Sequence, residues 1–412
     1  MGDGHLHEHS TDTGPIDSRI RRVTITIAVV LGIATVIGLI LLWPSGTPTI
    51  DTGELGMTNT SYPATVTRVN TFECPTEEPL DPDATDTERA DAAETDRSCG
   101  EIYFRLEEGP DTGEIRMVDA YDLSLRPAVN IGDRIIVPYF ANSDGPMQYS
   151  PNFERERAWP MIVLALTFAA LVIIQGRLRG LSALAGLVAS IGVILVFVLP
   201  AIINGSQPVL VAVVAASVIA YLALYLAHGF NVLTTVALLG TLASLILVTA
   251  LSWLFTELTA ISGVSEEVLY LRAFGGELDF GGLLLAGIIL GSLGALDDMT
   301  VTQASAVAEL HRADPTSGFT ALYRSAIRIG RDHVASTVNT LALAYAGASL
   351  PLLLVFLSSN QSFGRILTSE VVATEIVRTL VGSIGLVASV PLTTALAARL
   401  VTAQPTVKLG QP

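Results

Sequence analysis

Long apolar segments separated by short polar connections dominate the second half of this 412-residue sequence, and they constrain its fold most. Runs of about 20 apolar residues are long enough to cross the ~30 Å hydrocarbon layer of a bilayer as helices. We therefore predict membrane-spanning helices at 159–175, 181–203, 208–227, 232–255, 282–303, 337–357 and 379–398. Half of all residues are hydrophobic and only 15% are charged, which favours an integral membrane protein.

One further apolar segment lies near the amino terminus. Residues 1–18 form a polar tail with three histidines, which we expect to be disordered rather than metal-binding. A cluster of arginines then precedes an apolar stretch, so 19–43 is predicted to be an uncleaved signal anchor. The expected fold is thus α-helical with about eight transmembrane helices. Its N-terminus and the tail 401–412 would both lie in the cytoplasm, across the plasma membrane from 44–157.

Residues 44–157 are predicted to form an acidic, β-rich extracytoplasmic domain inserted after the first helix. They hold 23 acidic residues and nine arginines, a balance of −14 out of a net charge of −16. A polyanion such as nucleic acid is therefore excluded as a partner. The stretches "YPATVTRV" and "EIYFRL" alternate apolar and polar residues, and Gly-containing turns separate further β-branched runs. We expect a small β-barrel or β-sandwich.

Both cysteines of the chain fall in this domain. A disulfide between Cys74 and Cys99 is expected in an oxidising compartment, where it would close the acidic stretch between them into a loop. Two free thiols are the alternative.

Several enzyme classes are excluded by missing motifs. The only lysine is Lys408, so the chain has neither a Walker A phosphate loop nor a Schiff-base lysine in the bundle. HExxH and CxxC are absent as well. We expect no enzymatic activity, no cofactor and no metal site.

The most informative motif is "GALDDMTVTQASAVAEL" at 294–310, which places Asp297 and Asp298 side by side. They are the only charged residues from Phe280 to Ala308, so the pair is predicted to lie within the membrane or at its inner edge. Adjacent carboxylates repel each other, and a low dielectric penalises their charge, so one of them can hold a proton. Such intramembrane carboxylates serve proton relays and cation sites. The alternative is a pair at the water boundary that binds nearby arginines.

Helical spacing predicts which polar residues lie near the aspartate pair. A proton or ion relay would follow one polar face of a helix buried in the bundle. Its residues are Asp297, Asp298, Thr302, Ser305 and Glu309, with Gln303 to the side and Asn339 and Thr340 hydrogen-bonding from the following helix. On the same helix Gly287, Gly291 and Gly294 are expected to pack closely against a neighbouring helix.

Residues 311–336 are expected to be the longest inner connection of the bundle 158–400. After the turn "DPTSG", 319–335 is predicted to be an amphipathic helix with three arginines on one face, lying on anionic lipid. His333 is expected at the interface.

The stretches "GALDDMTVTQASAVAEL" and "GRDHVASTVNTLALAYAGASLPLLL" resemble the YibE/F-like family of bacterial multi-pass membrane proteins. The resemblance covers most of the chain from about Trp159. It implies an anchor, a small outer domain and a helix bundle, but no activity.

Residues 283–400 also resemble half of a resistance-nodulation-division type permease repeat, through a Gly-rich helix with an aspartate pair, "LPLLL" and "VPLTTAL". That resemblance implies that Asp297 and Asp298 relay protons across the membrane. The chain differs from those permeases in lacking a second repeat, an intramembrane lysine and a large outer domain.

The sequence therefore predicts a proton- or cation-coupled transporter, or an export accessory, for a small-molecule or ion substrate. The alternative is a non-transporting scaffold whose extracytoplasmic domain recruits a protein partner. Membrane lipid is an expected partner in both cases, and the Gly-rich helix faces would also suit a homo-oligomer.

Overall fold

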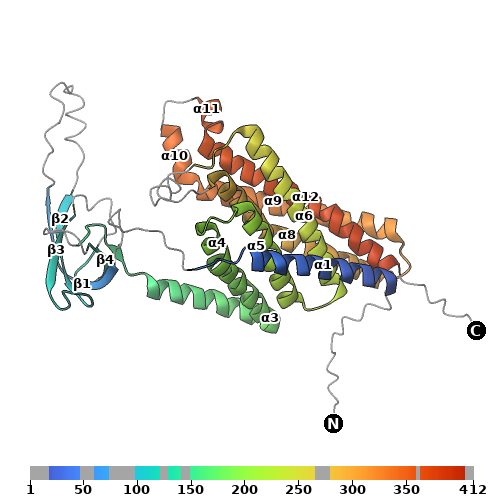
Figure 1. Cartoon of the computed structure of the whole chain (residues 1–412), viewed down its shortest axis with the longest axis horizontal. Coiled ribbons are helices and arrows are strands. Elements are labelled where there is room, and N and C mark those ends of the chain that lie inside the picture. The colour runs from blue at the N-terminus through green and yellow to red at the C-terminus, as the bar shows by residue number, and fades with distance from the viewer. Residues whose placement is uncertain are drawn as a thin grey trace, which may run out of the picture. The chain divides into compact units, whose positions relative to one another are not determined.

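The computed structural model describes residues 18–46, 60–73, 98–120, 129–140, 149–264, 279–358 and 362–403. It divides the chain into two compact units, one of residues 51–170 and the other of 1–50 with 171–412. The first unit carries a β-sheet and the second a helix bundle (Figure 1).

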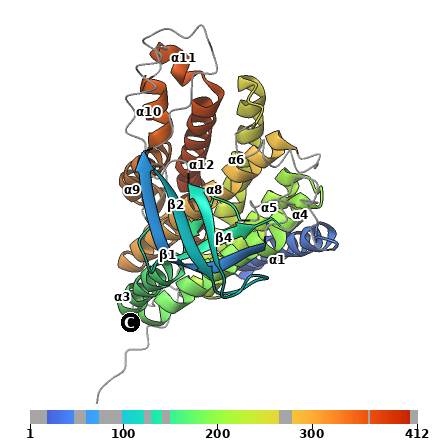
Figure 2. The same ribbon diagram turned by 90° about the vertical axis from the view of Figure 1, so that its left-hand side faces the viewer.

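The sheet of the first unit is antiparallel and follows the order β3-β2-β1-β4-β5 (Figure 2). Its strands are β1 (Thr60–Glu73), β2 (Ser98–Leu106), β3 (Ile115–Ala120), β4 (Arg134–Tyr139) and β5 (Glu154–Arg155). Alternate residues of the three central strands point into one core, which includes Ala64, Val66, Ile102, Phe104, Ile135 and Val137. Strand alternation therefore produces this buried face.

The small β-sheet expected near the amino terminus is confirmed, whereas the domain bounds 44–157 and the barrel or sandwich stay predictions. The described strands form one sheet with two edges, β3 and β5, and β5 is only two residues long. Cys99 is buried in β2 and Cys74 lies outside the described residues, so their disulfide stays a prediction.

The bundle begins with α1 (Ser18–Leu41), whose mostly exposed apolar side chains suit contact with lipid. The chain re-enters the bundle through α3, the π-helical segment η2 and α4. The remaining helices follow in chain order. The bounds are α3 (Ala158–Val193), η2 (Ile194–Val198), α4 (Leu199–Ile203), α5 (Pro208–His228), α6 (Val232–Thr259), α8 (Phe280–Ala313), α9 (Phe319–Ala348), α10 (Leu350–Ser358), α11 (Phe363–Leu367) and α12 (Glu370–Thr402).

Six helical stretches in the described ranges are long and apolar enough to cross a membrane, or seven if α9 and the bent α10 form one span. The chain is thus a membrane protein, as expected. The sequence predicted about eight spans because it separated 159–175 from 181–203. By length and composition the two segments form one stretch, Ala158–Ile203, but the non-helical backbone of Arg177 divides it between the two predicted spans, so the count of eight stays a prediction.

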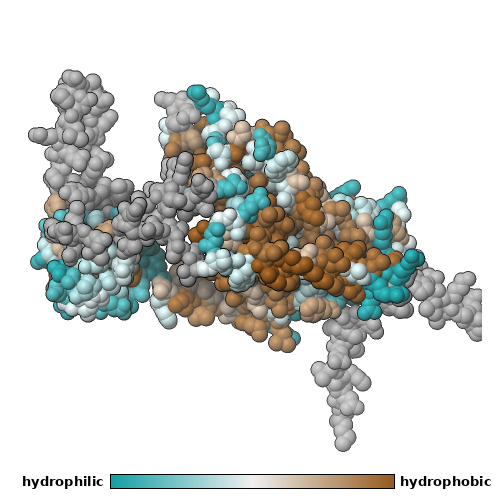
Figure 3. Space-filling view, viewed as in Figure 1, coloured by the Kyte–Doolittle hydropathy of each residue, from teal (hydrophilic) through white to brown (hydrophobic). Residues whose placement is uncertain are grey.

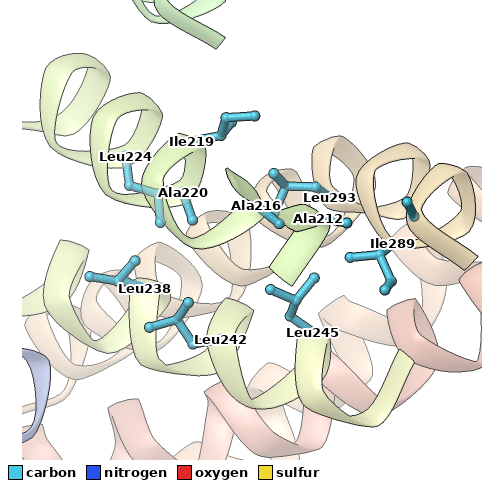
Figure 4. Packing of buried hydrophobic residues seen from close by; sticks show 11 residues of the cluster. Ala212, Ala216, Ile219, Ala220, Leu224, Leu238, Leu242, Leu245, Ile289 and Leu293 are labelled. Carbon is cyan, nitrogen blue, oxygen red and sulfur yellow. The ribbon is translucent and has the colours of Figure 1, made fainter. Parts of the chain in front are cut away.

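One core of the bundle is an apolar layer between α5, α6 and α8 (Figure 4). Small residues on α5 lie against leucines of α6 and branched side chains of α8. The layer consists of Ala212, Ala216, Ile219, Ala220, Leu224, Leu238, Leu242, Leu245, Ala286, Ile289 and Leu293. On the outside, hydrophobic residues cover the surface around α1, and hydrophilic residues gather at the end where α1 begins (Figure 3).

The connection between α8 and α9 is shorter than the sequence indicated. The Asp314 carboxylate accepts hydrogen bonds from Thr316 and Ser317 and forms the turn. Helix α9 then runs without a break through 335–337, where we expected an amphipathic helix to end and a span to begin. No glycine or proline lies at that point to end the helix.

Candidate functional site

The two adjacent aspartates of α8 occupy different environments. Asp297 lies close to the midpoint of this 34-residue helix and is partly buried. Its Oδ1 atom is buried and has no hydrogen-bond partner within the described ranges. Thr241 of α6 is the neighbouring side chain that interacts with the Asp297 carboxyl. A carboxyl oxygen inside the bundle is therefore available to a ligand.

Asp298 faces away from the bundle interior. Its side chain is 64% exposed, and its Oδ2 lies 3.2 Å from Nε2 of His333 on α9. The sequence analysis expected His333 at the interface and did not foresee this contact. Neither aspartate is recorded in an ion pair with the arginines of 319–335 in the described part of the chain.

Hydroxyls of α6 and α8 contact Asp297, and further buried polar groups of α8 and α12 follow along the bundle. Thr241 of α6 and Thr300 of α8 share a hydrogen bond of 2.8 Å between their hydroxyls. The Thr300 hydroxyl also lies 3.1 Å from the backbone oxygen of Asp297. One turn further, Thr394 of α12 donates to Gln303 Oε1 over 2.9 Å. We call Asp297, Thr241, Thr300, Gln303, Thr393 and Thr394 the polar cluster.

The polar cluster is incompletely hydrogen-bonded. Gln303 Nε2 and Thr393 Oγ1 are buried without a partner among the residues described, as is Oδ1 of Asp297. An unsatisfied buried polar group costs about 1–3 kcal/mol. Such groups persist where a bound ion, water or proton uses them, so the cluster is a candidate binding site.

Glycines let the helices approach at this cluster, although not the glycines that the sequence indicated. A side chain at Gly240 of α6 would collide with Thr393 of α12, and one at Gly330 of α9 would lie 2.6 Å from Gln303 Nε2. In contrast, three glycines of α8 that we expected at a helix contact are exposed. These are Gly287, Gly291 and Gly294. Helix α8 packs through the opposite face.

The predicted polar face of α8 also lies elsewhere. Ser305 and Glu309 are exposed and Thr302 is partly buried, whereas Gln303 is fully buried. Asn339 and Thr340 of α9 are exposed, and the Thr340 hydroxyl donates to the backbone of its own helix. Helix α8 turns its 299–300 and 303–304 positions inward, and the relay through Thr302, Ser305 and Glu309 stays a prediction.

Two cavities lie at opposite ends of α5, α6 and α8. The Arg179 cavity, of about 620 Å³, contains Ser305 and Glu309 in its wall and reaches Ala237 and Val301. One helical turn beyond those two residues lie Thr241 and Asp297. The Glu257 cavity, of about 850 Å³, is lined by the other ends of the same helices. The apolar layer occupies the helix positions between them.

The sequence matches the YibE/F-like protein family over residues 164–403, which is more than half of the chain. The protein belongs to the YibE/F-like family. The match covers α5, α6, α8, α9 and α12, and therefore every residue of the polar cluster. No curated protein and no solved structure matches the chain, so the likeness to resistance-nodulation-division permeases stays a prediction.

The polar cluster itself was missed by the sequence analysis apart from Asp297 and Gln303. A signal was present, since Thr241, Thr300, Thr393 and Thr394 interrupt helices that are otherwise apolar. Threonine is common in membrane helices, where its hydroxyl bonds its own backbone, so the signal was weak. Among the residues described, no group of three or more His, Cys, Asp or Glu could hold a metal ion.

Proposed function

We propose that this YibE/F-like protein is a proton- or cation-coupled permease or export accessory in which Asp297 takes up and releases the coupling ion. One observation carries the proposal: a carboxyl oxygen near the midpoint of a membrane-type helix is buried without a hydrogen-bond partner in the described chain. Carboxyl groups inside membrane bundles are expensive and are kept where they bind ions or protons.

The surrounding chemistry suits a proton or a monovalent cation. Oxygen atoms of Asp297, Thr241, Thr300 and Thr393 come from helices α6, α8 and α12. Hard cations prefer carboxylate, hydroxyl and carbonyl oxygens. A proton would need only Asp297, and a cation would also recruit the partnerless Thr393 hydroxyl.

The cavities support a route to this site. Ala237 and Val301 form part of the Arg179 cavity, one helical turn from Thr241 and Asp297. On the other side, the apolar layer lies at the helix positions between Asp297 and the Glu257 cavity, where α6 also carries the buried hydroxyls of Ser244 and Ser252. Coupled transport would require this layer to rearrange, since an ion cannot cross a close-packed apolar region.

The proposed topology follows the arginines. The N-terminus, the C-terminus and the Arg179 cavity would lie in the cytoplasm, and the sheet and the Glu257 cavity outside the plasma membrane. In this arrangement Asp298 and His333 would form an auxiliary pair on the bundle surface.

A flux measurement tests the proposal. Purified protein in liposomes under a pH gradient or a sodium gradient should dissipate the gradient. Asp297→Asn should reduce this flux about a hundredfold, the scale of losing a positioned proton-transfer group. The matched control is Asp298→Asn, which should retain measurable flux. Wild-type flux in the Asp297→Asn protein would overturn the assignment.

A second candidate is a scaffold whose outer sheet recruits a protein partner. Its support is the edge strand β3, where Ile115 and Met117 are 53% and 41% exposed. Exposed apolar edges favour strand addition or other protein contacts. Removal of residues 50–150 would abolish function under this reading, whereas Asp297→Asn would leave function intact.

A further inference from the structure

The Arg179 cavity carries basic groups that the ion-coupling proposal does not use. Arg179 of α3, His228 of α5 and Arg312 of α8 all line it. Glu309 is the one carboxylate in its described lining, and it is already paired with Arg312. Within the described ranges, Arg179 makes no hydrogen bond or ion pair. The cavity therefore holds an excess of positive charge with an unpaired guanidinium.

The backbone just before Arg179 has a strained conformation. Arg177 has φ 51° and ψ −129°, outside the helical region, and it interrupts α3. Positive φ is unfavourable for an arginine, so packing must enforce it. That packing includes Gly180, where a side chain would collide with the backbone oxygen of Val172. The chain thus turns sharply two residues before the arginine that lines the cavity.

A helix amino terminus lies at the same cavity. Asn231 caps α6, accepting from the Thr234 amide, and Val232 and Leu233 line the wall. The amides of a first turn have no carbonyl partner within the helix, and they carry the positive end of its dipole. Together with a guanidinium, such amides favour phosphate-like anions.

We propose that the Arg179 cavity binds a phosphate-class anion. Arg179 would donate two parallel hydrogen bonds, the α6 amino terminus would face the remaining oxygens, and Arg312 would stay oriented by Glu309. The same chemistry is presented by a phospholipid headgroup and by free phosphate. This inference goes beyond ion coupling and does not depend on Asp297.

The test uses the full chain purified in a neutral detergent, with two probes. Inorganic phosphate is titrated while thermal unfolding is followed. Separately, the protein is reconstituted with phosphatidylcholine alone or mixed with phosphatidylglycerol, and lipid retained after extraction is counted by native mass spectrometry. Each probe is applied to wild type, to Arg179→Gln and to the control Arg365→Gln, an exposed arginine of α11 outside the cavity.

Arg179→Gln should weaken binding of the effective probe about tenfold, the scale of one lost charge-assisted pair, while Arg365→Gln should not. An Arg179-dependent shift with phosphate identifies a free anion. Arg179-dependent retention of phosphatidylglycerol identifies a headgroup. Equal binding by all three proteins, or binding of neither probe, overturns the proposal. Asp297→Asn should bind the effective probe as wild type does. A failure of the ion-coupling proposal would therefore appear in the flux measurement and not in this one.

Discussion

The β-sheet of the first unit and the helix bundle of the second differ in how their carboxylates are hydrogen-bonded. In the sheet, Arg134 contacts Glu107 at 2.7 Å and Glu156 at 3.0 Å. Asp111 accepts a hydrogen bond from the Tyr149 hydroxyl over 2.7 Å. In the bundle, Asp297 has a buried oxygen with no such partner in the described residues. Among the described residues, these carboxylates of the sheet are held by hydrogen bonds and ion pairs, whereas Asp297 keeps a buried oxygen that a ligand can use.

The electrostatic consequences are visible in the sheet. The hydrogen bond from Arg134, followed by that from Thr65, lowers the pKa of Glu107. The hydrogen bond from Tyr149, followed by that from Arg116, lowers the pKa of Asp111. Burial, and then the contact with Asp111, raises the pKa of Tyr149. These groups keep their ordinary charge states at neutral pH and are fixed in place.

A substitution at the close helix approach around the polar cluster should have the largest effect on the stability of the bundle. Gly240→Val forces a branched side chain into Thr393 and should destabilise the bundle by about 1–3 kcal/mol, as overpacked cores do. The measurement is thermal unfolding in detergent. Gly294→Val is the matched control, because Gly294 has open space around it, and it should change stability by less than about 0.5 kcal/mol.

A strong effect of Gly294→Val would mean that another chain packs on the exposed face of α8. In that case the face of α8 that carries Gly294 would be a packing surface, like the opposite face.

Two adjacent threonines of α12 sharpen the contrast between satisfied and unsatisfied groups. Thr394→Val removes the donor to Gln303 and leaves a buried oxygen unpaired, so it should cost about 1–3 kcal/mol. Thr393→Val removes a hydroxyl that has no partner among the described residues, so it should be close to neutral for stability. Unfolding measurements on both variants decide this. If Thr393→Val is as costly as Thr394→Val, the hydroxyl is satisfied and the site is not vacant for a ligand.

The sequence predicts features that depend on a segment's own residues better than features that depend on how the helices pack. Strand alternation predicted the sheet, since its core is formed by its own residues such as Val66 and Phe104. Apolar length predicted the helices, but not their rotation. In a membrane both lipid and protein accept apolar side chains, so hydropathy does not say which side of α8 faces inward. The sequence therefore identified Asp297 and Asp298 but could not separate them. It expected Gly294 at a helix contact and gave Gly240 no role.

Acid should destabilise the sheet through its paired carboxylates. Glu107 and Asp111 have folded pKa values below their ordinary values of 4.5 and 3.8. Their contribution is therefore complete above those ordinary values and is lost as the pH falls through the lowered folded values. Near-ultraviolet circular dichroism of the full chain follows this transition. The double variant Glu107→Gln with Asp111→Asn should flatten the acid dependence, and an unchanged dependence would show that other groups cause it.

The smallest effect is expected from a single surface pair. Arg134→Gln removes the contacts with Glu107 and Glu156, but its side chain is 53% exposed, so solvent screens the interaction. The loss should stay within about 1 kcal/mol and shrink at high salt. Thermal unfolding at low and high ionic strength measures it. A larger, salt-independent loss would indicate that Arg134 has a packing role.

The central claim is that Asp297 is the carboxyl in the bundle that exchanges its proton. Dicyclohexylcarbodiimide, an apolar reagent that modifies protonated carboxyl groups, tests this directly in the intact membrane protein, with labelled residues located by mass spectrometry. The account predicts labelling of Asp297 that declines as the pH rises, weaker labelling of Asp298 beside His333, and none of Glu107 or Asp111. Labelling of Asp298 in preference to Asp297, or pH-independent labelling of both, would contradict it.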